Sequence, residues 1–207
     1  MSMNSWRARL FAGAALLLLA AVAVTACSKT PNPETQIANM IAAHNRHDVT
    51  GQLSFFAEDA AIAVGGQTPF TGKAAIRNLY EADSVMKSEL EYTGLAVRGD
   101  TVVVNSVVER NDLLRLLGLS EVHYLPGTRV VFRKGLIQSI ETSRLDQREW
   151  RAMRDSFAAL MNWVQAKHPE LLKEIGSGRL SGNNATAARG WMEVVSRWRQ
   201  SEAGGEK

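Results

Sequence analysis

The sequence predicts an α+β fold, with three helices near the N-terminus, a run of β-strands in the middle and a helical C-terminal extension. Three observations lead to this prediction. Apolar residues recur at helical spacing after residue 34. Strand-like segments separated by turn residues lie between residues 90 and 145, and helical spacing returns after residue 146. The sheet is therefore expected to come from the middle of the chain.

The first helices are marked by spacing and by capping residues. Apolar side chains three and four positions apart predict a helix over Glu34–Arg46. Asp48 is a suitable N-cap for a second helix, because its carboxylate can accept from backbone N–H groups of the first turn. Ala60–Val64 is a short apolar strand that Gly65 ends, and a third helix is expected to begin after Thr71.

Two hairpins are predicted to follow. Leu90–Arg98 and Thr101–Asn111 are joined by the two residues Gly99 and Asp100, a connection suited to a tight hairpin turn. His123–Lys134 and Leu136–Leu145 form a second candidate hairpin that turns near Gly135. The segment between the two hairpins is rich in leucine, and we expect about one helical turn there.

The last quarter of the chain is predicted to be helical. Asp146 with Glu149 three residues later is typical of a helix start, and Trp150 to Val164 carries large apolar residues at three-four spacing. A short helix is expected between Pro169 and Gly176, and a final helix carries Trp191 and Trp198. Residues 151–207 are therefore predicted to be a helical C-terminal extension, which either covers the domain's own apolar surface or binds a partner.

The N-terminal segment has the features of an export signal. Arg7 and Arg9 precede an uninterrupted run of apolar or small residues from Leu10 to Ala26. The segment Val24-Thr25-Ala26-Cys27 resembles the lipobox of bacterial lipoproteins, in which an apolar residue and small residues precede a lipidated cysteine. Residues 1–26 are thus predicted to be a lipoprotein signal peptide, Cys27 the lipidated first residue of the mature protein, and residues 27–33 a lipidated tether.

An uncleaved transmembrane anchor is the alternative for this segment. Its 17 residues lie at the lower edge of membrane-spanning length, and many of them are alanine. We therefore expect an exported protein that is lipid-anchored to the cell membrane or to the outer membrane, on the periplasmic face if the source is Gram-negative. Its first partner would be the membrane, reached through the lipid anchor.

Composition excludes several other classes of protein. Of 207 residues, 45% are hydrophobic and 22% are charged, which is typical of a globular chain. The net charge is only +3 and no basic cluster is interleaved with aromatic residues, so we expect no nucleic acid partner. Cys27 is the only cysteine, and the four histidines lack partners at metal-ligand spacing. No metal and no cofactor are expected.

Several short strings carry a resemblance to a known superfamily. They are Asn45-Arg46-His47-Asp48, Phe56-Ala57-Glu58-Asp59-Ala60, Phe70-Thr71-Gly72-Lys73-Ala74-Ala75-Ile76 and Asp146-Gln147-Arg148-Glu149-Trp150. With the order of elements, they make residues 34–150 resemble the nuclear transport factor 2-like superfamily. That group includes ketosteroid isomerases, SnoaL-like polyketide cyclases and limonene epoxide hydrolases. The resemblance implies a cone-shaped, curved mixed β-sheet packed on three N-terminal helices, with a pocket inside the cone.

The strand that ends at Glu109-Arg110-Asn111-Asp112 resembles the Arg-x-Asp pair of the limonene epoxide hydrolases. The resemblance implies that Asp112 is an acid and that Arg110 bridges it to a second carboxylate. Side chains two apart on a strand share a face, so both residues are expected in one row with Val108. Glu141 is a candidate for the second carboxylate, and Tyr92 a candidate donor to a ligand oxygen.

Two function classes follow from these residues. The positions that hold water in the hydrolases fall on Ile62 and Val64, which are apolar and favour a non-catalytic binder of a small hydrophobic ligand or a protein partner. Arg110 and Asp112 favour the alternative, an acid/base enzyme such as an isomerase, a cyclase or an epoxide-hydrolase-like protein. Hydrolysis of epoxides at rates typical of the family is not expected. The candidate pocket-lining residues are Ile62, Val64, Val108 and Leu114, and a homodimer or an envelope protein partner is possible.

Overall fold

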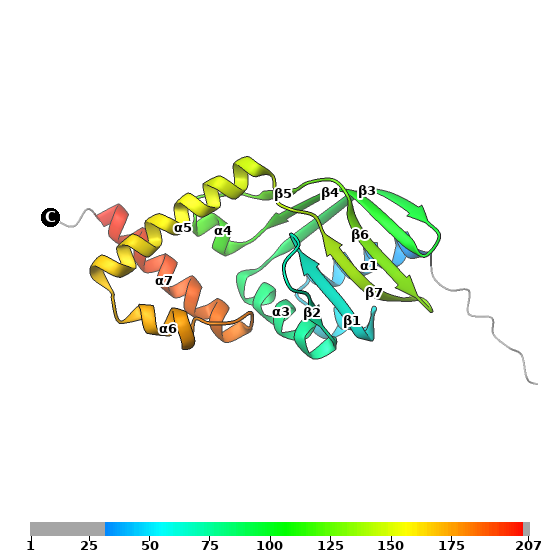
Figure 1. Ribbon diagram of the computed structural model, residues 1–207, viewed down its shortest axis with the longest axis horizontal. Helices are drawn as coiled ribbons and strands as arrows, with labels where there is room; N and C mark the ends of the chain where they lie inside the picture. Colours follow the sequence, from blue (N-terminus) through cyan, green and yellow to red (C-terminus); the bar gives the residue numbers. More distant parts are fainter. Residues whose placement is uncertain (1–31, 205–207) are drawn as a thin grey trace, which may run out of the picture. The chain divides into compact units, whose positions relative to one another are not determined.

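The computed structural model describes residues 32–204 (Figure 1). The predicted signal peptide, Cys27 and most of the predicted tether lie outside the described residues. The helices are α1 (Pro33–Asn45), α2 (Val49–Leu53), α3 (Lys73–Met86), α4 (Asp112–Leu116), α5 (Gln147–Lys167), α6 (Leu171–Ser177) and α7 (Ala185–Gly204). The strands are β1 (Phe56–Val64), β2 (Phe70–Thr71), β3 (Glu89–Arg98), β4 (Thr101–Arg110), β5 (Val122–Tyr124), β6 (Thr128–Arg133) and β7 (Leu136–Thr142).

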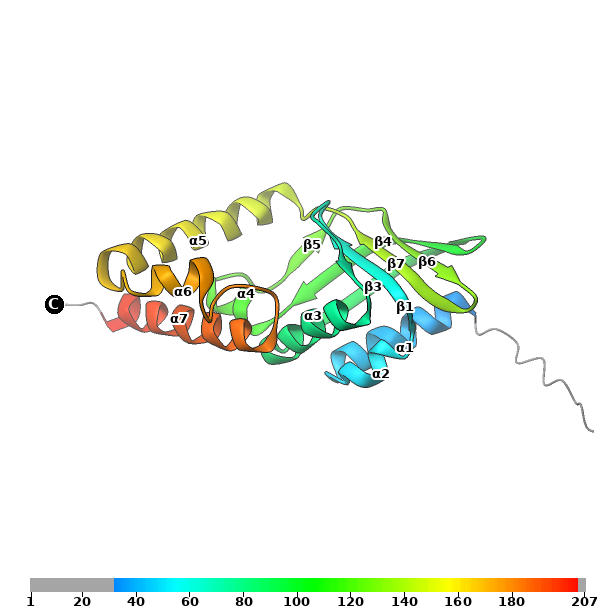
Figure 2. The same ribbon diagram turned by 60° about the horizontal axis from the view of Figure 1, so that its bottom comes forward.

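The strands form one mixed sheet in the order β2-β1-β7-β6-β4-β3, and β5 pairs with part of β4 beside β6. Only the β1–β7 pair is parallel among the described strands. Figure 2 shows α1, α2 and α3 together on one side of this sheet. The predicted α+β class, with a curved mixed sheet on three N-terminal helices, is confirmed.

The helices meet the sheet through a continuous apolar core. Ile37 and Met40 of α1 and Ile76 of α3 are almost fully buried against Phe56 of β1 and the valines of the sheet, such as Val102. Burial of a large aliphatic or aromatic side chain stabilises a fold by about 1.5–3 kcal/mol, so this cluster fixes where α3 lies over the sheet. The position of α3 matters because it forms one wall of the pocket described below.

Local signals explain where several elements begin and end. The Asp48 side chain accepts from the backbone N–H of Gly51, as expected of an N-cap, and Asp146 does the same for Arg148 at the start of α5. The predicted strand over 123–134 is instead two strands, β5 and β6. Pro126 and Gly127 separate them, because proline lacks the N–H that a ladder requires and Gly127 has a φ of +108°.

The alternation of side chains along β4 changes phase midway. Val104 is fully buried in the core, whereas further along the strand it is Val107 and Glu109 that face the interior. Gly94 on β3 lies against Asn105 at this point, and the φ of Gly94 is +67°. A Cβ added to Gly94 would lie 2.8 Å from the Cβ of Asn105. A glycine with positive φ inside a strand marks a local departure from regular strand geometry, although the register between β3 and β4 is unbroken here.

The C-terminal helices form a second layer with its own core. In this layer α7 contacts α3 and α4, and α5 contacts both α6 and α7. Leu160 and Val164 of α5, Val194 and Trp198 of α7 and Leu117 just after α4 are buried together. The predicted boundary at residue 150 lies in the first turns of α5. Among residues 32–204, no helix combines the length and apolar character that a membrane span requires.

Candidate functional site

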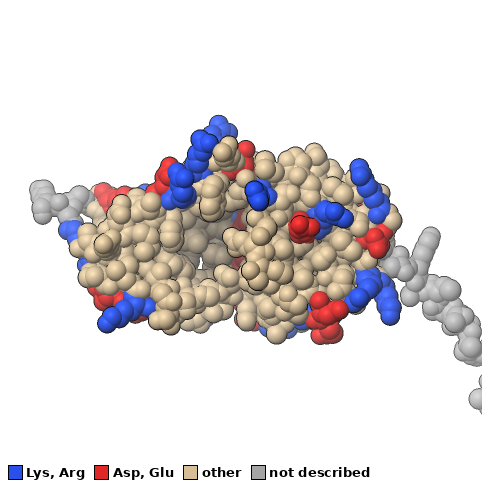
Figure 3. All heavy atoms as spheres, in the orientation of Figure 1, with Lys and Arg blue, Asp and Glu red and all other residues tan. Residues whose placement is uncertain are grey.

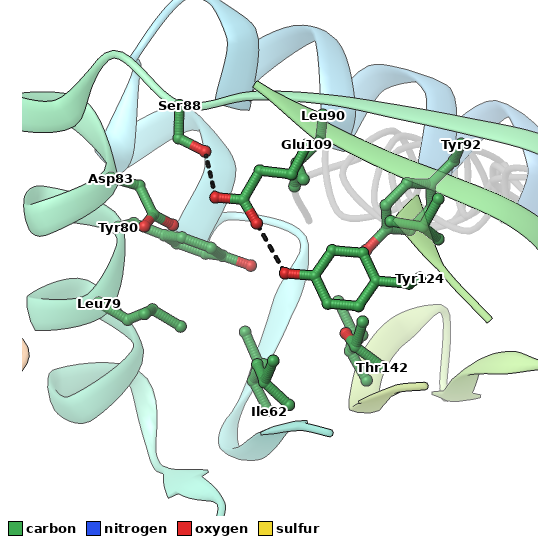
Figure 4. A pocket seen from close by; sticks show the side chains of 13 residues that line it. Ile62, Leu79, Tyr80, Asp83, Ser88, Leu90, Tyr92, Glu109, Tyr124 and Thr142 are labelled. Atoms are coloured by element: carbon green, nitrogen blue, oxygen red, sulfur yellow. Dashed lines mark hydrogen bonds between the residues drawn. The ribbon is translucent and has the colours of Figure 1, made fainter. Parts of the chain in front are cut away.

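A pocket of about 220 Å³ lies between α3 and the sheet (Figure 4). Its walls are mainly apolar, and its polar groups come from α3, the start of β3, the end of β4 and β5. The thirteen residues that line it are Ile62, Val64, Leu79, Tyr80, Asp83, Ser88, Leu90, Tyr92, Val107, Glu109, Tyr124, Ile140 and Thr142. A largely apolar cavity with a few convergent polar groups is the usual form of a small-molecule site.

Glu109 of the pocket accepts hydrogen bonds from three side chains. Its Oε1 accepts from Ser88 Oγ at 3.1 Å and from Asn111 Nδ2 at 2.8 Å, and its Oε2 accepts from the Tyr124 hydroxyl at 2.7 Å. Each carboxylate oxygen of Glu109 therefore has at least one hydrogen-bond donor. Figure 4 shows Ser88 and Tyr124 reaching Glu109 from opposite sides, so its position is fixed.

Neighbouring turns place the donors around Glu109. Lys87 ends α3 in the left-handed conformation with a φ of +52°, which turns the chain so that Ser88 starts beside the end of β4. Asn111 is the N-cap of α4, and its Oδ1 accepts from the backbone N–H of Leu114 at 2.7 Å. The Asn111 amide is thus held by the helix cap while its Nδ2 donates to Glu109.

Asp83 is the second carboxyl of the pocket and has a different environment. It lies on the last turn of α3, and among the described residues no hydrogen bond or ion pair reaches its side chain. Lys87, one turn further on, instead approaches Asp112, with its Nζ 3.6 Å from the carboxylate. Burial, reinforced by the charge of Glu109, raises the pKa of Asp83 well above its usual range. Asp83 therefore keeps its proton to a higher pH than an exposed aspartate does.

Three tyrosines complete the polar part of the site. Burial raises the pKa of Tyr80, Tyr92 and Tyr124, so their hydroxyls remain protonated at neutral pH. For Tyr124 the charge and the hydrogen bond of Glu109 add to this effect. The site thus combines a hydrogen-bonded carboxylate, a carboxyl with a raised pKa and three phenols, set in an apolar wall.

Three of the predicted residues line this pocket. Ile62 and Val64 face it from β1 and Tyr92 faces it from β3. Val108 and Leu114 are buried but do not line it. Val108 falls on the opposite face of β4 because the alternation changes phase near Gly94, and Leu114 belongs to the short helix α4 rather than to a strand.

Arg110 and Asp112 lie outside the pocket, and the prediction that they share a strand face is wrong. Arg110 is the last residue of β4, where its Nε lies 2.8 Å from Glu121 and its Nη1 3.3 Å from Glu91. Hydrogen bonds to these two acids, Glu91 first, raise its pKa. Asp112 is the first residue of α4 and pairs with Arg115. The strand ends at Arg110, two residues before Asp112, so it does not carry both side chains.

Glu141 is exposed on β7, while its neighbour Thr142 lines the pocket.

Two carboxyl residues of the pocket, Glu109 and Asp83, were not predicted from the sequence. Glu109 belongs to the string that drew attention to Arg110, and the isolated Gly94 within a strand was the available signal of a phase change. Within residues 32–204, no cluster of three or more His, Cys, Asp or Glu side chains is arranged to hold a metal ion.

The pocket is the last feature needed to compare the observed fold with the predicted one. Three helices precede a curved mixed sheet, the first long strand pairs in parallel with the last one, and a pocket opens between α3 and the sheet. This is the arrangement that the resemblance implied for residues 34–150. The described part of the chain therefore has a nuclear transport factor 2-like fold.

Comparison with known proteins gives matches in structure only. The sequence matches no protein-family model, and no curated protein matches it. The epoxide hydrolase/cyclase-like enzyme SalBIII, described with a role in pyran ring formation in the polyether salinomycin, is 18% identical, with 56% of this chain and 92% of that chain covered and a TM-score of 0.49.

Two further solved structures are of the same kind. A nuclear transport factor 2-like protein of unknown function from Cytophaga hutchinsonii is 14% identical over 57% of this chain and 93% of its own, with a TM-score of 0.45. A de novo designed protein with a curved β-sheet is also 14% identical, over 61% and 94% of the two chains, with a TM-score of 0.45. At these identities the chemistry of the site must be argued from its own residues.

Proposed function

We propose that this protein is a cell-envelope lipoprotein whose nuclear transport factor 2-like pocket binds a small, mainly apolar molecule without converting it. One observation carries the proposal, namely a pocket whose apolar walls end in a fixed group of polar side chains around Glu109. Apolar surface supplies affinity in such sites, and a few placed polar groups orient the ligand.

The size of the pocket limits the ligand. An apolar cavity of about 150 Å³ can hold a benzene ring. The 220 Å³ measured here therefore suits one ring or a short branched chain with a small polar group. Val107, Ile140 and Leu90 would contact the apolar body of the ligand, and Glu109 with Tyr124 would face its polar end.

The state of Glu109 favours binding over catalysis. A general base must be free to take a proton from the substrate. Glu109 already accepts from Ser88, Asn111 and Tyr124, so proton transfer to it would break or weaken these contacts. Ile62 and Val64, which line the pocket, also offer no group that holds a water molecule.

Acid/base catalysis is the second candidate function, and it is favoured by Asp83. A carboxyl that keeps its proton beside an ionised carboxylate can serve as a general acid, because the two groups have been driven to different protonation states. Under this candidate function Asp83 and Glu109 would replace Arg110 and Asp112 as the reacting pair.

The binding proposal predicts that a larger side chain in the pocket wall weakens binding. The full-length protein in lipid nanodiscs would be titrated by calorimetry with small aromatic and terpenoid molecules, and the best ligand should bind with a Kd near 1 μM, about −8 kcal/mol. Val64→Trp should weaken this binding at least tenfold, because Val64 lines the pocket. Val97→Trp is the matched control, since Val97 is an exposed residue of β3 outside the pocket.

Two results would change the conclusion. Equal affinity in the Val64→Trp and Val97→Trp variants would place the ligand outside the pocket. Mass spectrometry of the same mixtures would show whether the ligand is converted. Conversion that is lost in Asp83→Asn would establish the second candidate function instead.

The proposed lipid anchor predicts that the mature protein begins with an acylated cysteine. Asn32 caps α1 by accepting from the Glu34 N–H at 3.0 Å, and α1 begins six residues after Cys27. Six residues span at most about 20 Å, which would hold the domain close to the membrane. Mass spectrometry of the mature protein should find an acylated Cys27, and Cys27→Ser should leave an uncleaved precursor. An intact Met1, or a soluble mature N-terminus after Cys27, would contradict the assignment.

A further inference from the structure

The charge of the pocket is unbalanced. Two of its thirteen lining residues are acidic, Asp83 and Glu109, and none of the thirteen is Lys, Arg or His. The cations nearest in sequence are engaged elsewhere, since Lys87 approaches Asp112 and Arg110 pairs with Glu91 and Glu121. Charged groups removed from water are normally paired with an opposite charge. In the described part of this protein the pair of carboxyls has no such partner.

The rest of the pocket also suits a cation. Tyr80, Tyr92 and Tyr124 surround the two carboxyls in Figure 4, and the faces of aromatic rings attract positive charge. The other ionisable group packed against this set is His44, whose ring meets Tyr80 edge-on at 5.8 Å between centroids. Burial, with the nearby His47, lowers the pKa of His44 to about 4, so His44 is neutral at pH 7 and does not supply the missing charge.

We propose that the pocket selects a small hydrophobic amine in its protonated form, with the ammonium group between Asp83 and Glu109 and the apolar body against Leu90, Val107 and Ile140. This inference rests on the proposed function, that the pocket binds a small and mainly apolar molecule. It adds the charge of the ligand, which the apolar residues Ile62 and Val64 alone do not indicate.

Binding of the amine would be coupled to the proton of Asp83. An ammonium group beside both carboxyls favours their ionised forms and reverses the effect of the charge of Glu109 on Asp83. Where Asp83 is protonated in the free protein, the amine enters as a cation, the Asp83 O–H bond breaks and one proton leaves to solvent. Affinity should therefore rise with pH over the range in which Asp83 would otherwise keep its proton, as long as the amine itself stays protonated.

A pair of matched probes tests the charge. The full-length protein in nanodiscs would be titrated with 2-phenylethylamine and with 2-phenylethanol, which differ only in the terminal group. We expect the amine to bind at least tenfold more tightly than the alcohol at pH 7. Calorimetry at pH 7.5 in phosphate and in Tris, two buffers with different ionisation enthalpies, should show release of up to one proton per amine bound and little exchange for the alcohol.

Substitutions locate the ammonium group. Asp83→Asn and Glu109→Gln keep the shapes of the side chains and should each reduce the affinity for the amine at least tenfold, while the affinity for the alcohol changes less than threefold. Asp83→Asn should also abolish proton release. Asp112→Asn is the matched control, because this aspartate is close in the fold but outside the pocket. Its amine affinity should equal that of the wild type.

The outcomes separate this inference from the function on which it rests. Equal affinities for the two probes, or an amine preference that survives both Asp83→Asn and Glu109→Gln, would overturn the amine inference and leave a binder of neutral molecules. Failure of both probes, together with failure of the aromatic and terpenoid set, would overturn the proposed function itself.

Discussion

Replacing Trp198 by Ala should lower the free energy of unfolding by about 3–5 kcal/mol. Trp198 is 3% exposed and packs among the buried residues of the C-terminal layer, including Leu160 and Val194. The Arg199 guanidinium lies 4.3 Å from the centre of its ring, so the truncation removes a cation–π contact together with the apolar burial. Since domains are stable by only about 5–15 kcal/mol, this loss is a large part of the total.

Urea denaturation followed by far-ultraviolet circular dichroism measures the change. Trp150→Ala is the matched control, because Trp150 on α5 is 49% exposed and should cost less than about 1 kcal/mol. Similar losses in the two variants would mean that the C-terminal layer does not depend on the buried cluster. A second transition at low urea in Trp198→Ala would mean that the layer unfolds separately from the sheet.

Acidification should destabilise the protein through His44 by about 3 kcal/mol. His44 is 3% exposed in α1, and its Nδ1 lies 3.0 Å from the side-chain amide of Gln52. Burial first, and the charge of His47 second, lower its pKa from 6.5 to about 4. Because the folded state resists the proton, this stabilisation is complete above pH 6.5 and is lost as the pH falls from 6.5 to 4, at about 1.4 kcal/mol for each pH unit.

A histidine substitution isolates this effect from other titrating groups. Asp83 acts in the opposite direction, since its raised pKa contributes stability at low pH that is lost as the pH rises. We therefore compare the unfolding free energy at pH 7 and pH 4 for the wild type and for His44→Asn, whose drop should be about 3 kcal/mol smaller. His47→Asn should recover only part of this difference, because the charge of His47 is the second cause after burial, and asparagine tolerates the φ of +57° found there. A wild-type drop no larger than that of His44→Asn would refute the assignment.

The order of elements could be predicted because it depends on local signals. Asp48 and Asp146 are caps that act within one turn, and Gly99 with Asp100 joins β3 to β4 as expected. These features need no knowledge of distant residues. The second predicted hairpin was wrong at Pro126, because β5 and β6 are separate strands that pair with different parts of β4.

The pocket residues were harder to predict, because a row of side chains on a strand is certain only while the alternation continues. The alternation breaks between Val104 and Val107, so Glu109 rather than Arg110 faces the pocket. Asp83 lies on α3, a helix whose sequence pattern indicated only packing on the sheet. The raised pKa of Asp83 depends on burial near Glu109, which is separated from it in the chain by β3 and most of β4. Tyr124 likewise reaches Glu109 only through the pairing of β5 with β4.

Two neighbouring residues of β5 link the pocket to the C-terminal helices. The Tyr124 hydroxyl donates to Glu109, while His123, on the other face of the strand, meets Glu149 of α5 through both its backbone N–H and its ring Nδ1, the latter at 2.7 Å. The α3 wall of the pocket also contacts α7. For protein engineering, the unit that can be transplanted or recombined is therefore residues 33–204 as a whole. A hybrid joined near residue 150 would contain the pocket residues but would lack most of α5 and all of α7. Those helices contact β5 and α3, which carry pocket residues.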